Sequence, residues 1–346
     1  MITKIAMKFT HLHVHTHFSL LDGLSKIDNL ILRAKEYGMT SLAITDHGNM
    51  YGVIDFYDKC KKHGVKPIIG CELYVAKRKL DQKESHVDGR SYHLTALIKN
   101  DIGYKNLIKL VSIAHLEGFY YKPRIDKEVL KNHKEGIVFL SGCLKGEIAS
   151  HIYNGNMEEA EKSLNEYVEI LGKEDFYLEL QHHPNHEGQK KVNDGLRVLA
   201  KKYNLKTVLT CDSHYVDLDD KDTHEVLLSI QTGSAVGENE KMSMKNLDLS
   251  LKDPSELYEY YKGEEEMLER TCEVADKCNF DFDFKTLNYP VVKIEGVTDN
   301  EKFLRDTLKE KMPSFYGKDD QEALSRIEYE MGVVKQTGYV DYILIV

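Results

Sequence analysis

The sequence predicts an α/β fold in which a parallel sheet curls into a closed or nearly closed barrel. Seven short runs rich in branched apolar residues alternate with segments of helical periodicity, and this order is typical of strand–helix units. Seven such units in a row imply parallel strands joined by right-handed crossovers. No glycine-rich nucleotide-binding fingerprint follows the first strand, so a barrel is favoured over a dinucleotide-binding sheet.

The predicted strands are the runs whose branched and aromatic side chains suit a buried, pleated surface. In chain order they cover residues 8–14, 41–45, 66–75, 92–98, 136–142, 176–181 and 206–212. A polar segment at 77–91 separates the third strand from the fourth and is predicted to be a surface loop. The other connections are long enough to hold a helix.

The predicted helices carry apolar residues at positions i, i+3, i+4 and i+7, so that one face of each can pack on the sheet. The helix after the first strand spans 26–37, with Ser25 as its expected N-cap and Gly38 as its expected stop. Its apolar face consists of Ile27, Leu30, Ile31 and Ala34. Beyond the barrel, helices are predicted over 299–312 and 319–336.

Composition restricts the class of protein. The 346 residues are 41% hydrophobic and 30% charged, a globular balance that suits one large barrel or two domains. No long apolar run predicts a membrane span, and the first residues lack the pattern of a signal peptide. Six cysteines without a CxxC pair indicate a reducing, cytoplasmic setting. The net charge of −10 argues against a broad basic face for duplex DNA, so any nucleic-acid contact is expected to be local.

Residues 11–17 read HLHVHTH, with an imidazole at every second position. Alternate side chains of a strand point to one face, so at least the first three rings would project together. Either this strand is solvated, or its rings hold metal, because imidazole is the commonest metal-binding side chain.

Further candidate ligands follow the other predicted strands. Most lie at carboxyl ends, which converge on one mouth in a (β/α) barrel, whereas His93 begins its strand. Taken alone, Cys143 would be a small buried hydrophobe, but Glu72 in an apolar strand must be paired or metal-bound. Independent accidents rarely place so many such side chains at matching strand ends. The nine candidate ligands are His13, His15, Asp22, His47, Glu72, His93, Cys143, Asp212 and His214.

Several neighbouring residues allow two interpretations. Asp46 is expected to cap a helix or to orient a ligand rather than to bind metal itself. His182, His183 and His186 either approach the mouth or belong to a turn around Pro184.

Seven motifs occur in the order HLHVHTHFSLLDG, AITDHGNMYG, PIIGCELYV, YHLTALIKN, GFYYKPRID, LSGCLKGEI and TCDSHYV. Together they resemble the PHP (polymerase and histidinol phosphatase) domain family, in the form that opens the α subunit of bacterial DNA polymerase III. The resemblance extends from about Lys8 to the C-terminus. It implies a PHP metal-dependent phosphoesterase domain over 1–280 and, over 281–346, the truncated start of a polymerase palm region without the polymerase's catalytic aspartates.

The resemblance also implies a distorted seven-stranded, TIM-like (β/α)7 barrel with a C-terminal helical extension. Such a barrel holds up to three divalent metals through nine ligands, which by position are the nine residues named above. His11 and His17 match no ligand of the family and are set aside. Mixed imidazole, carboxylate and thiolate ligands suit zinc, with manganese or iron as competitors.

The function implied is metal-dependent phosphodiester hydrolysis, and we predict a proofreading-type 3′–5′ exonuclease that acts on the 3′ end of single-stranded DNA. Close metals would activate a water and clamp the attacking and leaving oxygens. Glu72 is predicted to bridge metals, and Asp212 or His214 to position the water. The candidate phosphate contacts, which are otherwise solvated surface charges, are Lys122, Arg124 and Lys145.

The partners expected from the resemblance are DNA, the remainder of the polymerase and a separate proofreading exonuclease subunit. Two other functions stay open. A histidinol-phosphatase-like phosphomonoesterase would share the metal chemistry, although such a chain normally ends soon after the DSH motif, which about 130 residues follow here. A non-catalytic scaffold would use the metals for stability and dock the exonuclease subunit.

Overall fold

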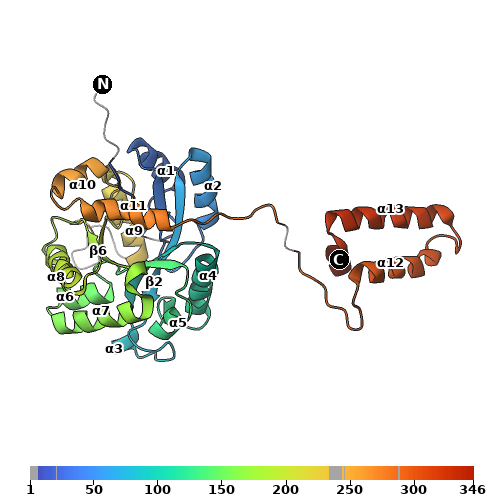
Figure 1. The fold of residues 1–346 in the computed structure, drawn as a ribbon, viewed down its shortest axis with the longest axis horizontal. Helices are drawn as coiled ribbons and strands as arrows, with labels where there is room; N and C mark the ends of the chain where they lie inside the picture. The colour runs from blue at the N-terminus through green and yellow to red at the C-terminus, as the bar shows by residue number, and fades with distance from the viewer. Residues whose placement is uncertain (1–6, 21, 234–243, 245, 287–288) are drawn as a thin grey trace, which may run out of the picture. The chain divides into compact units, whose positions relative to one another are not determined.

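The fold is that of a computed structural model, which describes residues 7–20, 22–233, 244, 246–286 and 289–346 (Figure 1). The described residues divide into two compact units, with the boundary in the chain between Asp281 and Phe282. A boundary after residue 280 is predicted from the sequence, and the assignment of the second unit to a polymerase palm region stays a prediction.

The first unit is built around a curled seven-stranded sheet (Figure 1). The hydrogen-bonded order is β1-β2-β3-β5-β6-β7, with β4 beside β2. This arrangement, with helices outside, confirms the predicted α/β class. The strands are β1 (Ser41–Ile44), β2 (Lys66–Val75), β3 (Tyr92–Ile98), β4 (Arg124–Ile125), β5 (Ile137–Leu140), β6 (Phe176–Gln181) and β7 (Thr207–Thr210).

The first predicted strand, 8–14, closes the sheet without forming a regular strand. Val14 pairs with Ser213 in a single parallel bridge on one side, and its carbonyl accepts a hydrogen bond from the Thr45 amide at 2.9 Å on the other. The Val14 amide donates instead to the Thr45 hydroxyl at 2.9 Å, so a side chain interrupts the backbone ladder. The segment therefore lies between β1 and the residues after β7 and completes the barrel.

The sheet is mixed, which corrects the prediction of an all-parallel barrel. β3 runs antiparallel to its neighbours β2 and β5, whereas the other strand pairs are parallel. The connection from β2 to β3 contains only the four-residue helix α3 (Ser85–Asp88), so no crossover helix returns the chain to the opposite end of the sheet. The chain therefore enters β3 at the end where it leaves β2. The amino end of β3 lies beside the carboxyl ends of the other strands.

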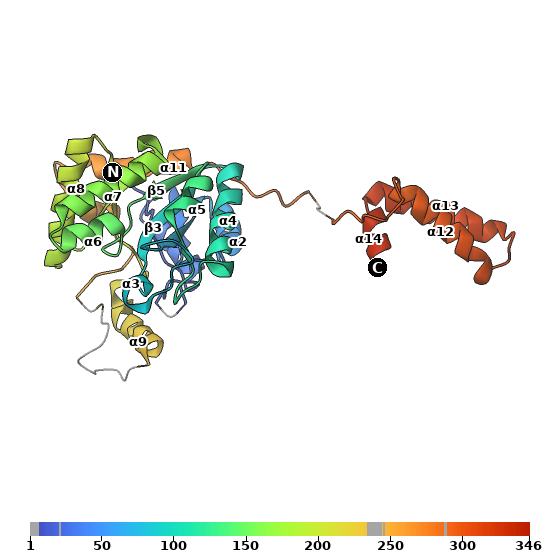
Figure 2. The same cartoon turned by 90° about the horizontal axis from the view of Figure 1, so that it is seen from below.

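Helices cover the outside of the barrel, as the apolar periodicity predicts (Figures 1 and 2). The four residues predicted for the apolar face of α1 are all buried, although Lys26 replaces Ser25 at the N-cap position. No helix among the described residues combines the length and apolar character needed to cross a membrane. The helices are α1 (Ile27–Glu36), α2 (Val53–His63), α4 (Asp101–Leu116), α5 (Lys127–Asn132), α6 (Glu147–Tyr153), α7 (Met157–Leu171), α8 (Glu187–Tyr203), α9 (Lys221–Thr232), α10 (Pro254–Tyr260) and α11 (Glu266–Lys277).

Helix α11 closes the amino end of the barrel. The Arg270 guanidinium donates to the carbonyl of Thr207 at the start of β7, at 3.2 Å, and Lys66 at the start of β2 donates to the Ala275 carbonyl at 2.7 Å. Apolar side chains of the helix join the buried core of the barrel, which contains Leu12, Ala43, Ile68, Leu97, Val138, Leu140, Tyr177, Val208, Val274, Ala275 and Cys278. The opposite end, where the carboxyl ends lie, is left for polar side chains.

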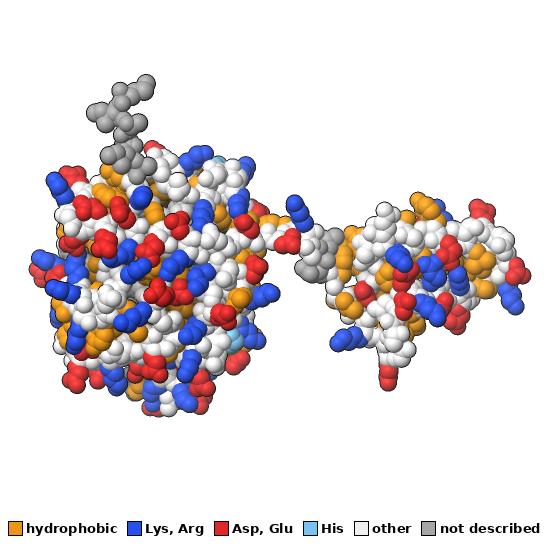
Figure 3. Space-filling view, in the orientation of Figure 1, with side chains coloured by type: hydrophobic (Ala, Val, Ile, Leu, Met, Phe, Trp, Pro, Cys, Tyr) orange, Lys and Arg blue, Asp and Glu red, His pale blue; other side chains and the backbone are white. Residues whose placement is uncertain are grey.

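The second unit is a small helical assembly. Helices α12 (Asn300–Lys311) and α13 (Gln321–Thr337) confirm the two predicted helices, and α14 (Val340–Ile345) follows them. Its buried apolar side chains are Leu304, Met312 and Met331. Apolar side chains are visible on its surface in Figure 3, and Phe315 is 79% exposed.

A glycine in α4 allows two backbones to touch. A Cβ added to Gly103 would lie 1.9 Å from the carbonyl oxygen of Gly136. Alanine favours helices by about 1 kcal/mol over glycine, but this clash should outweigh that preference. We expect Gly103→Ala to lower the free energy of unfolding by about 1–3 kcal/mol in chemical denaturation.

The matched control for this substitution is Lys105→Ala, an exposed position on the same helix, which should change stability by less than about 0.5 kcal/mol. A Gly103→Ala protein at least as stable as the wild type would contradict the close approach to Gly136.

Candidate metal centre

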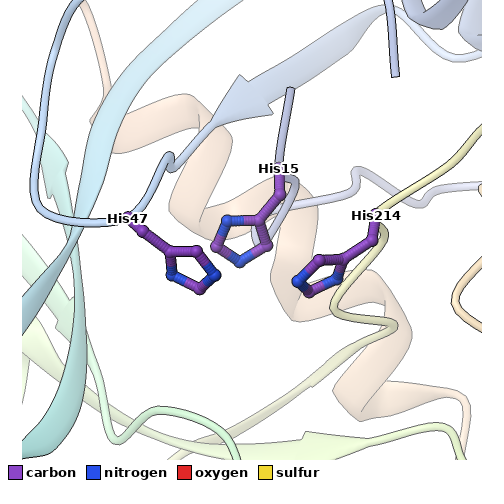
Figure 4. A group of neighbouring side chains, drawn as sticks. All are labelled: His15, His47 and His214. Atoms are coloured by element: carbon purple, nitrogen blue, oxygen red, sulfur yellow. The ribbon is translucent and has the colours of Figure 1, made fainter. Parts of the chain in front are cut away.

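The nine predicted ligands meet at one end of the barrel. His93 belongs to this end because β3 is antiparallel, which accounts for its position at the start of a strand. Figure 4 shows His15, His47 and His214, which come from three separate segments, with their rings turned toward one another. His13, His15 and Glu72 are fully buried, and His93, Cys143 and His214 are less than 10% exposed. His47, Asp212 and Asp22 are 16, 14 and 12% exposed, so they form the side of the cluster that is open to solvent.

Glu72 lies at the centre of the cluster. Its Oε1 atom is 2.8 Å from His93 Nδ1, 3.3 Å from His13 Nε2 and 3.8 Å from Cys143 Sγ. Its Oε2 atom contacts His47 Nδ1. The carboxylate is fully buried and joins groups from four different segments of the chain.

Asp212 forms a second point of convergence. Its Oδ1 atom is 3.3 Å from His13 Nε2, 3.2 Å from His15 Nε2 and 3.7 Å from His214 Nδ1. The backbone of Asp212 is left-handed, with φ at 50°, a conformation that side-chain-bearing residues rarely adopt. Strain of this kind is concentrated at functional sites, and here it accompanies a carboxylate held among three imidazoles.

The described residues contain three overlapping groups whose ligand atoms lie within 4.8 Å of one another. They are His15–His47–His214, His13–His15–Asp212 and His47–Glu72–His93. The remaining two predicted ligands lie at the edges of these groups. Asp22 Oδ2 is 3.0 Å from His47 Nε2, and Cys143 Sγ is 3.5 Å from His93 Nδ1.

Glu179 is a part of the site that the sequence analysis missed. This fully buried residue of β6 accepts a hydrogen bond from the Thr210 hydroxyl at 2.6 Å, and its Oε1 atom lies 2.6 Å from His13 Nδ1. Holding Nδ1 leaves the Nε2 atom of His13 for the cluster. The available signal was an acid in the otherwise apolar run FYLELQ, the same signal that singled out Glu72.

Asp46 supports the site indirectly, as the sequence suggested. It accepts hydrogen bonds from the Ser19 hydroxyl at 2.6 Å and the Thr16 amide at 2.7 Å, while Ser19 Oγ is 3.0 Å from His15 Nδ1. Asp46 thus orients the His15 ring through Ser19. His224 on α9, also missed from the sequence, lies with Nε2 2.7 Å from the backbone carbonyl of Asp22.

The other histidines of the sequence motifs lie outside the three groups. His11 is buried with Nε2 3.0 Å from the Lys252 carbonyl, and His17 is exposed. His186 caps α8 by accepting a hydrogen bond from the Gln189 amide at 3.0 Å, and its own amide donates to the His183 carbonyl at 3.0 Å, which closes the predicted turn around Pro184.

The three candidate phosphate contacts have different surroundings. Lys122 is exposed, and its Nζ lies 5.5 Å from the ring centroid of Tyr74, whose ring is 5.1 Å from that of His93. Lys145 is exposed, and its backbone carbonyl accepts from the His93 amide at 3.0 Å.

Arg124 is 1% exposed, and its guanidinium donates to three backbone carbonyls, those of Gly118, Asp88 and Leu80, at 3.1, 3.3 and 3.4 Å. Because a buried guanidinium with these partners cannot reach a substrate phosphate, we leave Arg124 out of the phosphate contacts.

Burial and charge set the protonation of these groups. Burial alone would lower the pKa of His47, but the carboxylates of Glu72 and Asp22 raise it to about 10. Burial and the neighbouring imidazole rings lower the pKa of His15 to about 3. Burial would raise the pKa of Glu72, yet His93 and His47 hold it well below its usual range. Neutral His15 and ionised Glu72 are the forms that bind metal, whereas His47 must release a proton to do so.

The donor set fits divalent cations. The Nε2 atoms of His13 and His15 lie 3.1 Å apart and within 3.3 Å of Asp212 Oδ1, so three electron-pair donors converge on one point. The Oδ1 atom of Asp22 is buried and has no hydrogen-bond partner among the described residues. Nitrogen, oxygen and sulfur donors together suit zinc, and manganese or iron are competitors.

Comparison with known proteins matches residues 11–183 to the PHP domain family. The DNA polymerase III subunit alpha of Borreliella burgdorferi is 38% identical, over 98% of this chain and 30% of that protein. The corresponding subunit of Thermus aquaticus is 44% identical, over 80% of this chain and 23% of that protein. The chain thus spans less than a third of the length of these two relatives.

Among solved structures, this chain is similar to the histidinol phosphate phosphatase of Lactococcus lactis in complex with zinc, L-histidinol and phosphate. The TM-score is 0.33 at 12% identity, and the match covers 66% of this chain and 95% of that one.

Glu179 offers a test of the support around the cluster. Glu179→Gln keeps the shape of the side chain but removes the charge that orients His13, so we expect zinc affinity to fall about 10- to 100-fold. The measurement is a competition titration against a zinc-binding dye. Glu174→Gln, an exposed acid in the turn before β6, is the matched control and should bind zinc like the wild type. Equal affinity for the two variants would remove Glu179 from the site.

Proposed function

The chain belongs to the PHP domain family, and we propose that the metal centre of its first unit hydrolyses phosphodiesters at the 3′ end of single-stranded DNA. The observation that carries this proposal is the convergence of Glu72, Asp212 and six imidazole or thiol ligands, with Asp22 at the edge, on one buried cluster that opens to solvent on one side. When bound there, divalent metals supply an activated water and stabilise the charge of a phosphoryl group in an in-line displacement.

The residues of the chain have distinct roles in this proposal. Glu72 would bridge two ions, because its two oxygens face different histidines. Asp212, on the side open to solvent, and the neighbouring His214 would orient the attacking water and accept its proton. Lys122 and Lys145 are exposed near His93 and would neutralise the charge of the bound phosphate.

We place this activity within a longer bacterial DNA polymerase III α subunit, because the relatives named above carry that name and are more than three times longer than the matched region. Its expected partners are then DNA, the remainder of the polymerase and a proofreading exonuclease subunit, in the cytoplasm. The 65-residue second unit would begin the palm region.

A second candidate function is a metal-stabilised scaffold. The predicted ligands come from the segment before β1, from β2 and β3, and from the residues after β1, β5 and β7, so bound ions would link the whole mouth of the barrel. Metal binding adds folding free energy whether or not the site is catalytic. A phosphomonoesterase of the histidinol phosphate kind is the third candidate.

We expect Asp212→Asn to reduce cleavage of a 5′-labelled single strand by about 100-fold or more, since loss of the carboxylate removes several kcal/mol of metal-dependent stabilisation. His13→Ala should act in the same direction, and both variants should retain less metal in elemental analysis. Asp219→Asn, in the exposed turn after Val216, is the control. Full cleavage by a protein that carries both Asp212→Asn and His13→Ala would exclude these residues from the mechanism. Faster turnover of p-nitrophenyl phosphate than of the DNA strand would favour a phosphomonoesterase.

Removal of metal by a chelator distinguishes the scaffold function from the enzymatic function. A metal present at 100 times its dissociation constant stabilises the folded chain by about 2.7 kcal/mol, so removal by a chelator should lower the melting temperature. We expect zinc to restore both the melting temperature and the hydrolysis. Restoration of stability by a stoichiometric metal, without hydrolysis of DNA or p-nitrophenyl phosphate, would establish the scaffold function alone.

A further inference from the structure

The segment from Gly118 to Pro123, between α4 and β4, forms a tight loop beside the metal centre. Tyr120 and Lys122 form an antiparallel bridge, with the Tyr120 amide donating to the Lys122 carbonyl at 3.0 Å. The Lys122 ammonium lies 5.5 Å from the ring centroid of Tyr74. The Tyr74 ring is in turn 5.1 Å from that of His93, so one series of contacts joins the loop to the cluster.

The loop presents aromatic rings to solvent. Phe119 is 53% exposed and Tyr121 is 64% exposed, although large aromatic side chains are normally buried for most of their surface. Tyr121 also has a left-handed backbone with φ at 59°, a conformation that Gly or Asn would adopt more easily. The Tyr121 ring packs edge-on against Tyr120, with 4.7 Å between the ring centroids, and its exposed surface is available for contact with something outside the barrel.

Buried groups hold this loop in shape. The Arg124 guanidinium donates to the Gly118 carbonyl at 3.1 Å and lies 5.2 Å from the ring centroid of Tyr120. A Cβ on Gly118 would be 1.9 Å from the Arg124 carbonyl oxygen, so the two ends of the loop are in close contact. The rings are therefore presented from a fixed base, which reduces the entropy lost when a ligand binds.

The charge of the chain limits what that ligand can be. The net charge of −10 disfavours broad electrostatic binding of a duplex, and acidic and basic side chains are interspersed on the face shown in Figure 3. Single strands are different, because stacking of each base on an aromatic side chain adds about 1–3 kcal/mol to the binding free energy that does not come from charge. Lys122, which follows the two rings in the chain and lies near Tyr74, can contact one phosphate.

We propose that Phe119, Tyr121 and Lys122, here called the aromatic rim, bind the unpaired nucleotides next to the phosphodiester that enters the metal centre. The two rings stack on bases, and the lysine contacts the phosphate between those bases and the scissile bond. This inference rests on the proposed function and extends it, because the rim selects a single-stranded polynucleotide over a small phosphomonoester.

The test compares two fluorescent strands of about ten nucleotides, a length within the range of known single-strand sites. One is oligo(dT) with cleavage-resistant phosphorothioates at its 3′ end, and the other is identical but lacks the bases nearest that end. Anisotropy titrations with the full chain, in the presence of zinc, measure the affinity for each strand. Stacking predicts that the wild type prefers the intact strand.

Phe119→Ala and Tyr121→Ala should each weaken binding of the intact strand by about 5-fold or more and reduce the preference for it over the abasic strand. Tyr121→Leu, which keeps the apolar bulk but removes the aromatic face, should behave like Tyr121→Ala while melting like the wild type. Lys122→Gln should weaken both strands and reduce the salt dependence of log affinity by about 0.7. Val198→Ala, at a 60% exposed position on α8, is the control and should bind both strands normally.

Two results would overturn the rim. The first is equal affinity of the wild type for the intact and abasic strands. The second is an unchanged preference for the intact strand in Phe119→Ala and Tyr121→Ala. Either result would indicate that the exposed rings contact a protein partner instead. Hydrolysis is scored separately with an unmodified strand. If the rings determine the preference for the intact strand but the chain never cleaves DNA, the proposed function is wrong and the aromatic rim still binds single strands. If the chain cleaves DNA and the ring variants have an unchanged KM, the aromatic rim does not bind the substrate and the proposed function stands.

Discussion

A buried carboxylate stays ionised only if charged or proton-donating groups surround it, and Glu72 imposes this requirement on the whole barrel. The residue is fully buried, and its partners His13, His47, His93 and Cys143 come from four segments that are distant in the sequence. Each segment must therefore reach the same end of the barrel with a particular side chain directed inward. The cluster and the closure of the sheet depend on each other.

One end of the barrel contributes apolar packing that stabilises the fold, and the other end carries the polar cluster. Helix α11 and the Cys278 residue that follows it place Val274, Ala275 and Cys278 into the apolar core at the amino end, where the contacts are with strand beginnings. The carboxyl ends carry the polar cluster, supported from behind by Glu179 and Asp46. Barrels with parallel strands generally show this division, and here it survives the reversal of one strand.

In the proposed function, recognition of the substrate near the centre is local because the chain as a whole is acidic. Lys122 and Lys145 are exposed beside the cluster, and the exposed rings of Phe119 and Tyr121 precede Lys122 in the same loop. Arg124, whose charge first suggested a phosphate contact, is instead buried beneath the loop that carries those rings and holds its shape. A guanidinium in that position contributes to recognition only by fixing other side chains.

The sequence by itself determined six of the seven predicted strands and the main helices, because apolar periodicity is a local property, and it identified the candidate ligands through residue chemistry and family motifs. Residues 8–14 form only an isolated bridge, and the two-residue β4 was not predicted. Only the tertiary structure decided how the elements meet. The antiparallel direction of β3, which places His93 at the mouth, depends on which end the chain enters after 77–91. The supporting role of Glu179 and the burial of Arg124 depend on contacts between residues far apart in the chain, such as Glu179 with His13, and no local pattern encodes those distances.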